Sequence, residues 1–144
     1  MIEFEIGKLK RASGDNKTFG DAYLDSIANV ECSFSFKLKD AIVFSEEHWN
    51  PVEFIEQLVK WKKSGLANSF HYSSMDTDEE DIFSFQKVNN KFRFKSVWAE
   101  AATERLFQQQ EIVKFIESIR NVTIERVLNE LQVDLREIDK LELK

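Results

Sequence analysis

A run of carboxylates is the sharpest chemical feature of the sequence. The six residues 76–81 contain five acidic side chains, Asp76, Asp78, Glu79, Glu80 and Asp81. Such oxygens could bind calcium, but the glycine and the glutamate that an EF-hand loop needs at its sixth and twelfth positions are missing. We therefore predict no metal ligands. The segment is interpreted either as a solvated turn or as a patch that meets a basic partner.

The histidines and the cysteine form no recognisable catalytic motif. His48 and His71 lie 23 positions apart and in no metal-ligand pattern. His48 follows Glu46 and Glu47, so an acid–base pair is conceivable, although a local hydrogen bond at a strand–helix junction is the more common role. Cys32 occupies an inward position of an alternating strand pattern and is predicted to be a core residue. A hydrolase would need these side chains to converge in a pocket, and we predict no catalytic residue.

Nucleotides, nucleic acids and membranes are not expected as ligands. The chain has four glycines and contains neither of the usual glycine-rich phosphate-binding motifs. Its formal net charge of −6 has the wrong sign for neutralising nucleic-acid phosphates. A single cysteine excludes an internal disulfide and favours a reducing, cytoplasmic setting. No apolar run approaches the roughly 20 residues of a membrane span, and no cofactor is predicted.

A predicted strand that leads directly into a predicted helix is the central element of the chain. The other elements, including those that position the acidic residues, are expected to pack around it. Residues 41–44 are apolar and rich in strand-forming side chains. Asn50 can cap a helix, and Pro51 suits its first position because proline lacks an N–H group there. The apolar spacing that follows predicts a helix over 51–63 with Trp61 on its buried face.

Alternating apolar and polar residues predict the strands. They are expected at residues 1–10, 29–39, 41–44, 69–74, 82–88 and 92–98. Asp40 and the pair Asn89-Asn90 supply tight turns, so two antiparallel hairpins are expected. The alternation slips near Lys95-Ser96, which predicts a bulge or a strand end.

The C-terminal part changes to helical periodicity. Two helices are predicted, around residues 112–119 and 124–138, with a break or a bend at Asn121–Thr123. We therefore predict one domain over residues 1–144, in which 1–99 are mostly strands and 100–141 are helical. The fold class is α+β, with an antiparallel sheet of about six strands packed against one central helix and the C-terminal helices.

Three segments together resemble a family of small, uncharacterised bacterial proteins. They read FSEEHWNPVEFIEQLVKW at 44–61, FHYSSMDTDEEDIFSF at 70–85 and FRFKSVWAE at 92–100. The resemblance covers roughly residues 30–120 and brings no catalytic residue with it. Members of this general type are similar to immunity proteins found beside secreted toxins of bacterial competition, so the resemblance implies a protein that binds another protein.

The expected function is that of a non-enzymatic binding protein, an immunity protein that covers the basic surface of a bacterial toxin domain. The expected contacts are the carboxylates and, if they are exposed, the aromatic anchors Trp98, Trp49 and Tyr72; the carboxylates are Glu46, Glu47, Asp76, Asp78, Glu79, Glu80 and Asp81. The alternative is a structural or regulatory homo-oligomer, a homodimer formed through the apolar seam at residues 124–138.

Overall fold

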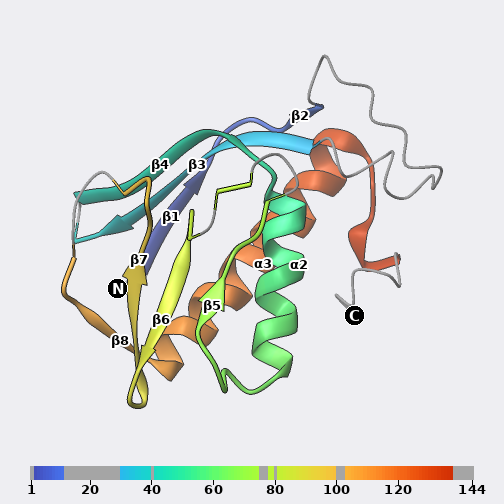
Figure 1. The fold of residues 1–144 in the computed structure, drawn as a ribbon. Helices are drawn as coiled ribbons and strands as arrows, with labels where there is room; N and C mark the ends of the chain where they lie inside the picture. Colours follow the sequence, from blue (N-terminus) through green and yellow to red (C-terminus); the bar gives the residue numbers. More distant parts are fainter. Residues whose placement is uncertain are drawn as a thin grey trace.

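The computed structural model describes residues 2–11, 30–39, 41–74, 78–79, 81–99 and 103–137. In these parts the chain is α+β, with two antiparallel sheets and two α-helices (Figure 1). The single sheet of about six strands that the sequence predicted is therefore wrong. Helix α2 (Pro51–Lys63) follows β4 directly and carries the chain away from the first sheet, so the next strands pair among themselves.

The first sheet is built around β3 (Val30–Leu38). Its neighbours are β1 (Ile2–Ile6), β2 (Lys10–Arg11) and β4 (Ala41–Trp49). Phe36 pairs with Phe4 of β1 and with Phe44 of β4, so these two strands lie on opposite edges of β3. The expected antiparallel pairing of 29–39 with the strand that starts at 41 is confirmed, while Asp40 itself lies outside the described residues.

A bulge separates β1 from β2 along the same edge of β3. Ile6 pairs with Phe34, but the next pair is Lys10 with Glu31. Three residues of one strand therefore face two of the other, which is the signature of a β-bulge. Gly7 keeps the edge in place, because its N–H group donates to the Ser33 carbonyl at 2.9 Å.

The second sheet is an antiparallel meander in chain order. Its strands are β5 (Phe70–His71), β6 (Ser84–Val88), β7 (Lys91–Lys95) and β8 (Leu106–Gln108). The turn between β6 and β7 lies at Asn89-Asn90, as predicted, and Asn89 has a φ of 57°. Strand β7 ends at Lys95, where the alternation slips. Residues 106–108, predicted to be helical, instead form β8 beside β7.

Helix α2 has the predicted bounds and the predicted cap. The side-chain oxygen of Asn50 accepts hydrogen bonds from the backbone N–H groups of Val52 at 3.1 Å and Glu53 at 3.0 Å. These bonds satisfy two of the N–H groups that a helix start leaves unpaired. Trp61 is buried, as its place on the apolar face predicted.

Helix α3 (Gln109–Leu131) is one continuous helix, so the predicted break at 121–123 is wrong. Asparagine and threonine are only modestly poorer helix formers than alanine. Here Thr123 and Ile124 are buried, and their packing outweighs the local preference. The helix ends at Leu131 instead of continuing to 138, because Gln132 adopts a left-handed conformation with a φ of 59°. A short 3₁₀ helix, η1 (Leu135–Glu137), follows.

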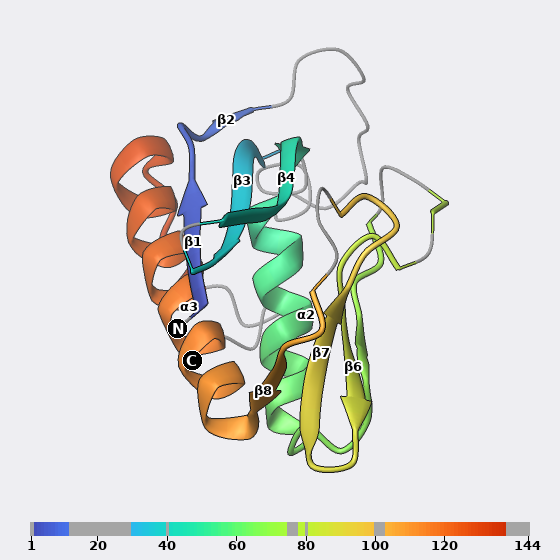
Figure 2. The same ribbon diagram turned by 90° about the vertical axis from the view of Figure 1, so that its left-hand side faces the viewer.

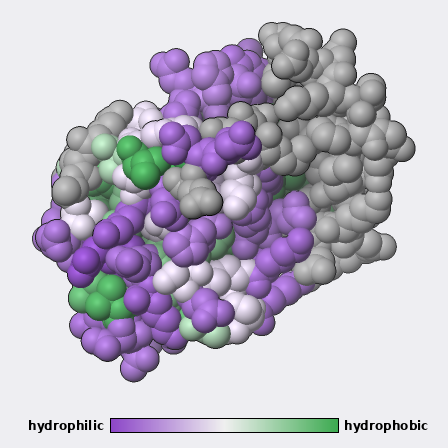
Figure 3. Space-filling model, viewed as in Figure 1, coloured by the Kyte–Doolittle hydropathy of each residue, from purple (hydrophilic) through white to green (hydrophobic). Residues whose placement is uncertain are grey.

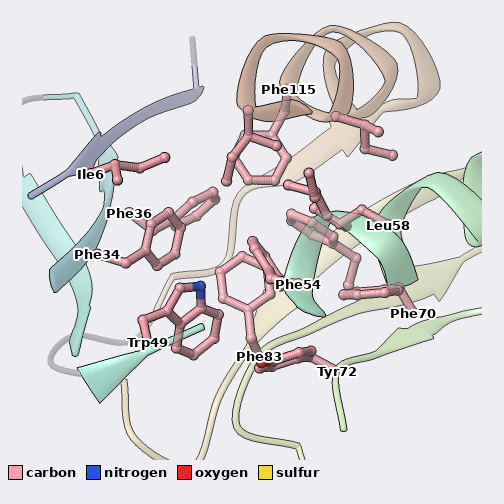
Figure 4. Packing of buried hydrophobic residues seen from close by; sticks show 14 of the residues in the cluster. Ile6, Phe34, Phe36, Trp49, Phe54, Leu58, Phe70, Tyr72, Phe83 and Phe115 are labelled. Atoms are coloured by element: carbon pink, nitrogen blue, oxygen red, sulfur yellow. The ribbon is translucent and has the colours of Figure 1, made fainter. Parts of the chain in front are cut away.

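Aromatic rings from both sheets and both helices meet in one core. Figure 2 shows α3 running beside β1 on one side, β6 and β7 on the other, and α2 between them. Phe83, just before β6, lies at the centre of the cluster (Figure 4), with ring centroids 4.9 Å from those of Phe54 and Phe94. Phe115 of α3 packs edge-on against Phe36 at 5.6 Å. The aromatic side chains therefore go inside, as the sequence predicted, and join the two sheets.

Candidate functional site

The described part of the acidic segment is exposed and tied to the chain that follows β7. Asp78, Glu79 and Asp81 are all exposed, while Asp76 and Glu80 lie outside the described residues. Asp81 has a φ of 58°, and its carbonyl accepts a hydrogen bond from the N–H group of Val97 at 3.0 Å. This bond places the backbone of Asp81 next to Val97.

Glu46 and Glu47 lie near the end of β4. The Glu46 carboxylate accepts hydrogen bonds from the backbone N–H groups of Glu47 at 3.1 Å and His48 at 3.2 Å. Glu46 is half-buried by this local turn, whereas Glu47 is exposed. The carboxylate of Glu46 is therefore held in one position by its own backbone.

Two neighbouring depressions bring these elements together. One, of about 180 Å³, is lined by Glu46 and Trp98 among others. The second, of about 410 Å³, is lined by the described acidic residues 78, 79 and 81. Both are also lined by Tyr72 and Ser74, so they adjoin each other. The structure thus gathers Glu46 and the described acidic residues Asp78, Glu79 and Asp81 on one face, although they lie more than 30 residues apart in the sequence.

Trp98 and Val97 remain exposed on this face. The exposed fraction is 36% for Trp98 and 60% for Val97. The N–H group of Trp98 donates to the Ser96 hydroxyl at 2.9 Å, which holds the turn that presents the indole ring. Val97 was not predicted to belong here. The available signal was the slip in alternation at 95–96, because a strand end leaves the following side chains outside the sheet's core face.

Trp49 and Tyr72 contribute almost nothing to the exposed surface, although both line the smaller depression. Each is only 2% exposed. The ring of Trp49 stacks on Phe34 with a centroid distance of 5.2 Å, and the Tyr72 hydroxyl donates to the Glu53 carboxylate at 2.8 Å. These two side chains were expected to anchor a partner only if they were exposed, and that condition is not met.

A bulge in β4 explains why Trp49 points inward. Phe34 pairs with Glu46, and Cys32 pairs with Trp49. Three steps along β4 therefore match two steps along β3, which inverts the alternation of side chains at this point. His48 turns outward and Trp49 turns into the core, as Figure 4 shows for Trp49.

The two histidines each contact a carboxylate at the surface. His48 Nδ1 lies 2.7 Å from Glu31 Oε1, and this hydrogen bond raises the pKa of His48 above its ordinary value. His71 Nδ1 lies 2.6 Å from Asp81 Oδ1. Both histidines therefore hydrogen-bond a carboxylate of another segment, 17 positions away for His48 and 10 positions away for His71.

Cys32 lies in the core, away from both imidazoles. Burial raises the pKa of its thiol to about 12, which leaves almost no thiolate at neutral pH. Among the described residues, Cys32 lines neither of the two depressions beside Tyr72. The same ranges contain no group of three or more His, Cys, Asp or Glu side chains arranged to hold a metal ion. What the face offers chemically is charge, hydrogen-bond acceptors and one exposed indole.

The molecular surface is mostly hydrophilic on the face drawn in Figure 3, where hydrophobic colour is confined to small separate areas. Within the part of the chain that the structure describes, no helix is both long enough and apolar enough to cross a bilayer. Exposed apolar residues are therefore notable where they gather, and Val97 and Trp98 are adjacent in sequence.

Among known proteins, the chain matches one family and no individual curated protein or solved structure. Neither the curated proteins nor the solved structures gave a match to the chain. One family profile does match, over residues 2–137, which includes every element from β1 to η1 and so extends well beyond the segments 44–100 that carried the resemblance. The chain therefore belongs to the family described as Domain of unknown function (DUF7878).

Proposed function

We propose that the protein is a non-enzymatic binding protein that covers a basic surface of another protein. The observation that carries this proposal is an exposed indole on the same face as several carboxylates. We call this surface the Trp98 face; it consists of Glu46, Asp78, Glu79, Asp81, Val97 and Trp98. Protein interfaces commonly combine an aromatic anchor with a polar rim, and tryptophan is enriched among the residues that dominate binding energy.

Binding would act by steric cover and would be accelerated by charge. The formal net charge of −6 and the carboxylates of the Trp98 face attract a basic partner. Such complementarity mainly raises the association rate and excludes wrong partners. The burial of Trp98 against the partner would then slow dissociation.

The partner class that best fits is a basic toxin domain. Support comes from the resemblance to immunity proteins of bacterial competition systems and from the sign of the charge. In that role the protein would act in the cytoplasm of the cell that makes it, where it blocks the toxin without chemistry of its own.

The test first asks whether a secreted protein with a toxic domain is encoded directly upstream, and then measures the binding of the Trp98→Ala variant to that domain. Leu106 is a matched control, because it is an equally exposed large apolar residue (37%) on β8. We expect Trp98→Ala to weaken binding by about tenfold or more and Leu106→Ala to leave it unchanged. The association rate should fall as salt rises from low to physiological. Equal effects of the two variants, or a salt-insensitive association rate, would contradict the proposal.

The alternative homodimer through residues 124–138 has weaker support. Of the predicted seam, Ile124, Val127 and Leu135 are buried within the chain itself, with exposed fractions of 6%, 0% and 0%. Leu128 remains exposed at 37% and lines a groove of about 340 Å³ with Arg120. Sedimentation of the Leu128→Asp variant tests this alternative: a dimer through the seam would dissociate, whereas a protein that is monomeric already would not change.

A further inference from the structure

The outer edge of β1 presents backbone groups that the rest of the described chain does not use. The Gly7 N–H group faces β3, since it donates to Ser33, whereas the Ile6 carbonyl faces away from β3 and accepts from Arg126 Nη1 at 2.8 Å. Successive residues of a strand direct their backbone groups to opposite sides. Ile2 and Phe4 therefore direct their N–H and C=O groups outward, and no described residue bonds to them.

A groove lies directly beside this open edge. It has a volume of about 630 Å³ and lies between β1 and the first turns of α3, with polar lining from Glu3, Glu111, Lys114 and Ser118. Ile2, Phe4 and Phe115 provide its apolar lining, and the rings of Phe4 and Phe115 meet edge-on at 5.8 Å. Strand addition uses this combination, because backbone bonds give affinity and an adjoining pocket accepts alternate side chains.

β1 also carries two carboxylates between its apolar residues, and one of them, Glu3, is among the residues that line the groove. Glu3 is exposed and has no partner among the described residues, and Glu5 pairs with Lys37 at 2.9 Å. A second copy of this strand fits poorly, because an antiparallel pair centred on Phe4 would place Glu3 opposite Glu5 of the other copy. Like charges directly opposite one another are destabilising. Lysine or arginine at these positions would be favourable instead.

We propose that the edge of β1 accepts an extended segment of a partner protein, in which apolar residues alternate with lysine or arginine. The segment pairs with Ile2 and Phe4, its apolar side chains enter the groove beside Phe115, and its basic side chains lie opposite Glu3 and Glu5. Arg126 limits the pairing to the first part of β1, because its guanidinium already occupies the carbonyls of Ile6 and Gly7. This surface lies on the opposite edge of the first sheet from Glu46, so it is separate from the Trp98 face.

The probe is a six-residue peptide of alternating lysine and valine with blocked ends, and it is tested against the full chain. Two control peptides separate the contributions: hexalysine keeps the charge without the alternation, and a version with N-methylated valines keeps the side chains but blocks strand pairing. We expect the first peptide to bind at least about tenfold more tightly than either control. It should also slow amide hydrogen exchange at Ile2 and Phe4. Equal binding of all three peptides would overturn the proposal, because it would show charge attraction alone.

Two protein variants with the same charge change locate the site. Glu3→Lys should weaken binding of the alternating peptide by about tenfold. Glu125→Lys should leave it within about twofold, because Glu125 is exposed on α3 and lines a different groove. Equal loss in both variants, or exchange protection elsewhere than β1, would overturn the proposal. So would concentration-dependent dimerisation of the chain that the peptide cannot displace, since a second copy would then occupy the edge.

Discussion

The two edges of the first sheet differ in the contacts that satisfy their backbone groups. On the β4 edge, the contacts come from β3 and β4: Glu46 accepts from the N–H groups of the next two residues, and a register shift against β3 buries Trp49. On the β1 edge, contacts come from α3: Arg126 donates to the carbonyls of Ile6 and Gly7 across about 120 positions of sequence. The β4 edge therefore ends in side chains exposed to solvent, whereas the β1 edge is half closed by a helix and half open.

The largest expected effect is a loss of stability when Trp49 is replaced. Its replacement by alanine should lower the free energy of unfolding by about 3–5 kcal/mol, because a large ring leaves a tightly packed core. The control is Trp98→Ala, which should change stability by no more than about 0.5 kcal/mol, as is usual for exposed residues. Urea unfolding followed by circular dichroism measures both. Similar losses of unfolding free energy in the two variants would contradict the assignment of Trp49 to the core and Trp98 to the surface.

The next largest effect concerns the hydrogen bonds from Arg126 to the carbonyls of Ile6 and Gly7, which we call the clamp on β1. Arg126→Met keeps the aliphatic stem but removes the donors to Ile6 and Gly7, and should cost about 1–3 kcal/mol of unfolding free energy. Lys62→Met is the matched control, because Lys62 forms an exposed ion pair with Glu117 at 3.0 Å. Exposed pairs contribute about 0–1 kcal/mol. If both variants lose the same amount in urea unfolding, the clamp is no stronger than a surface ion pair.

A smaller effect should appear as a pH dependence at Glu130. Its pKa is lowered, first by the hydrogen bond from Arg126 and further by one from the Leu9 N–H group at 3.1 Å. A carboxylate with a lowered pKa stabilises the folded state above its unfolded pKa, and this contribution disappears as pH falls through the folded pKa. The stability difference between the wild type and Glu130→Gln should therefore shrink on acidification. A difference that is constant from neutral to acidic pH would contradict this.

The smallest effect belongs to the β4 edge, at His48. Its pKa is raised, first by the hydrogen bond with Glu31. The resulting stabilisation is complete below the unfolded pKa and disappears as pH rises through the folded pKa. A proton NMR titration should place His48 above its ordinary pKa and return it toward that value in Glu31→Gln. An unchanged titration in the variant would assign the shift to other neighbours.

Local signals predicted what local forces decide. The start of α2 followed from Asn50 and Pro51, and the turn at Asn89 followed from a residue type that tolerates positive φ. The inward face of β3 followed from strict alternation, since the apolar residues on that face are all buried: Val30, Cys32, Phe34, Phe36 and Leu38. Each of these features depends on contacts within a few residues, so one sequence was enough to predict it.

Features that depend on distant contacts escaped prediction. The burial of Trp49 depends on a register shift against β3, and no residue near Trp49 signals that shift. The continuity of α3 through Thr123 depends on packing that outweighs helix preference. For the candidate site, the acidic segment and Glu46 were predicted as members, but their adjacency to Val97 depends on a bond from that residue to Asp81.

The sequence by itself determined the α+β class, the bounds of α2, the inward direction of the aromatic side chains and the acidic character of the surface. These follow from periodicity, caps and charge, which are properties of short segments. Only the tertiary structure decided that the strands form two sheets, that Trp98 and not Trp49 is exposed, and that Arg126 closes part of the β1 edge. The reason is that pairing register and long-range hydrogen bonds are chosen by the packing of the whole chain.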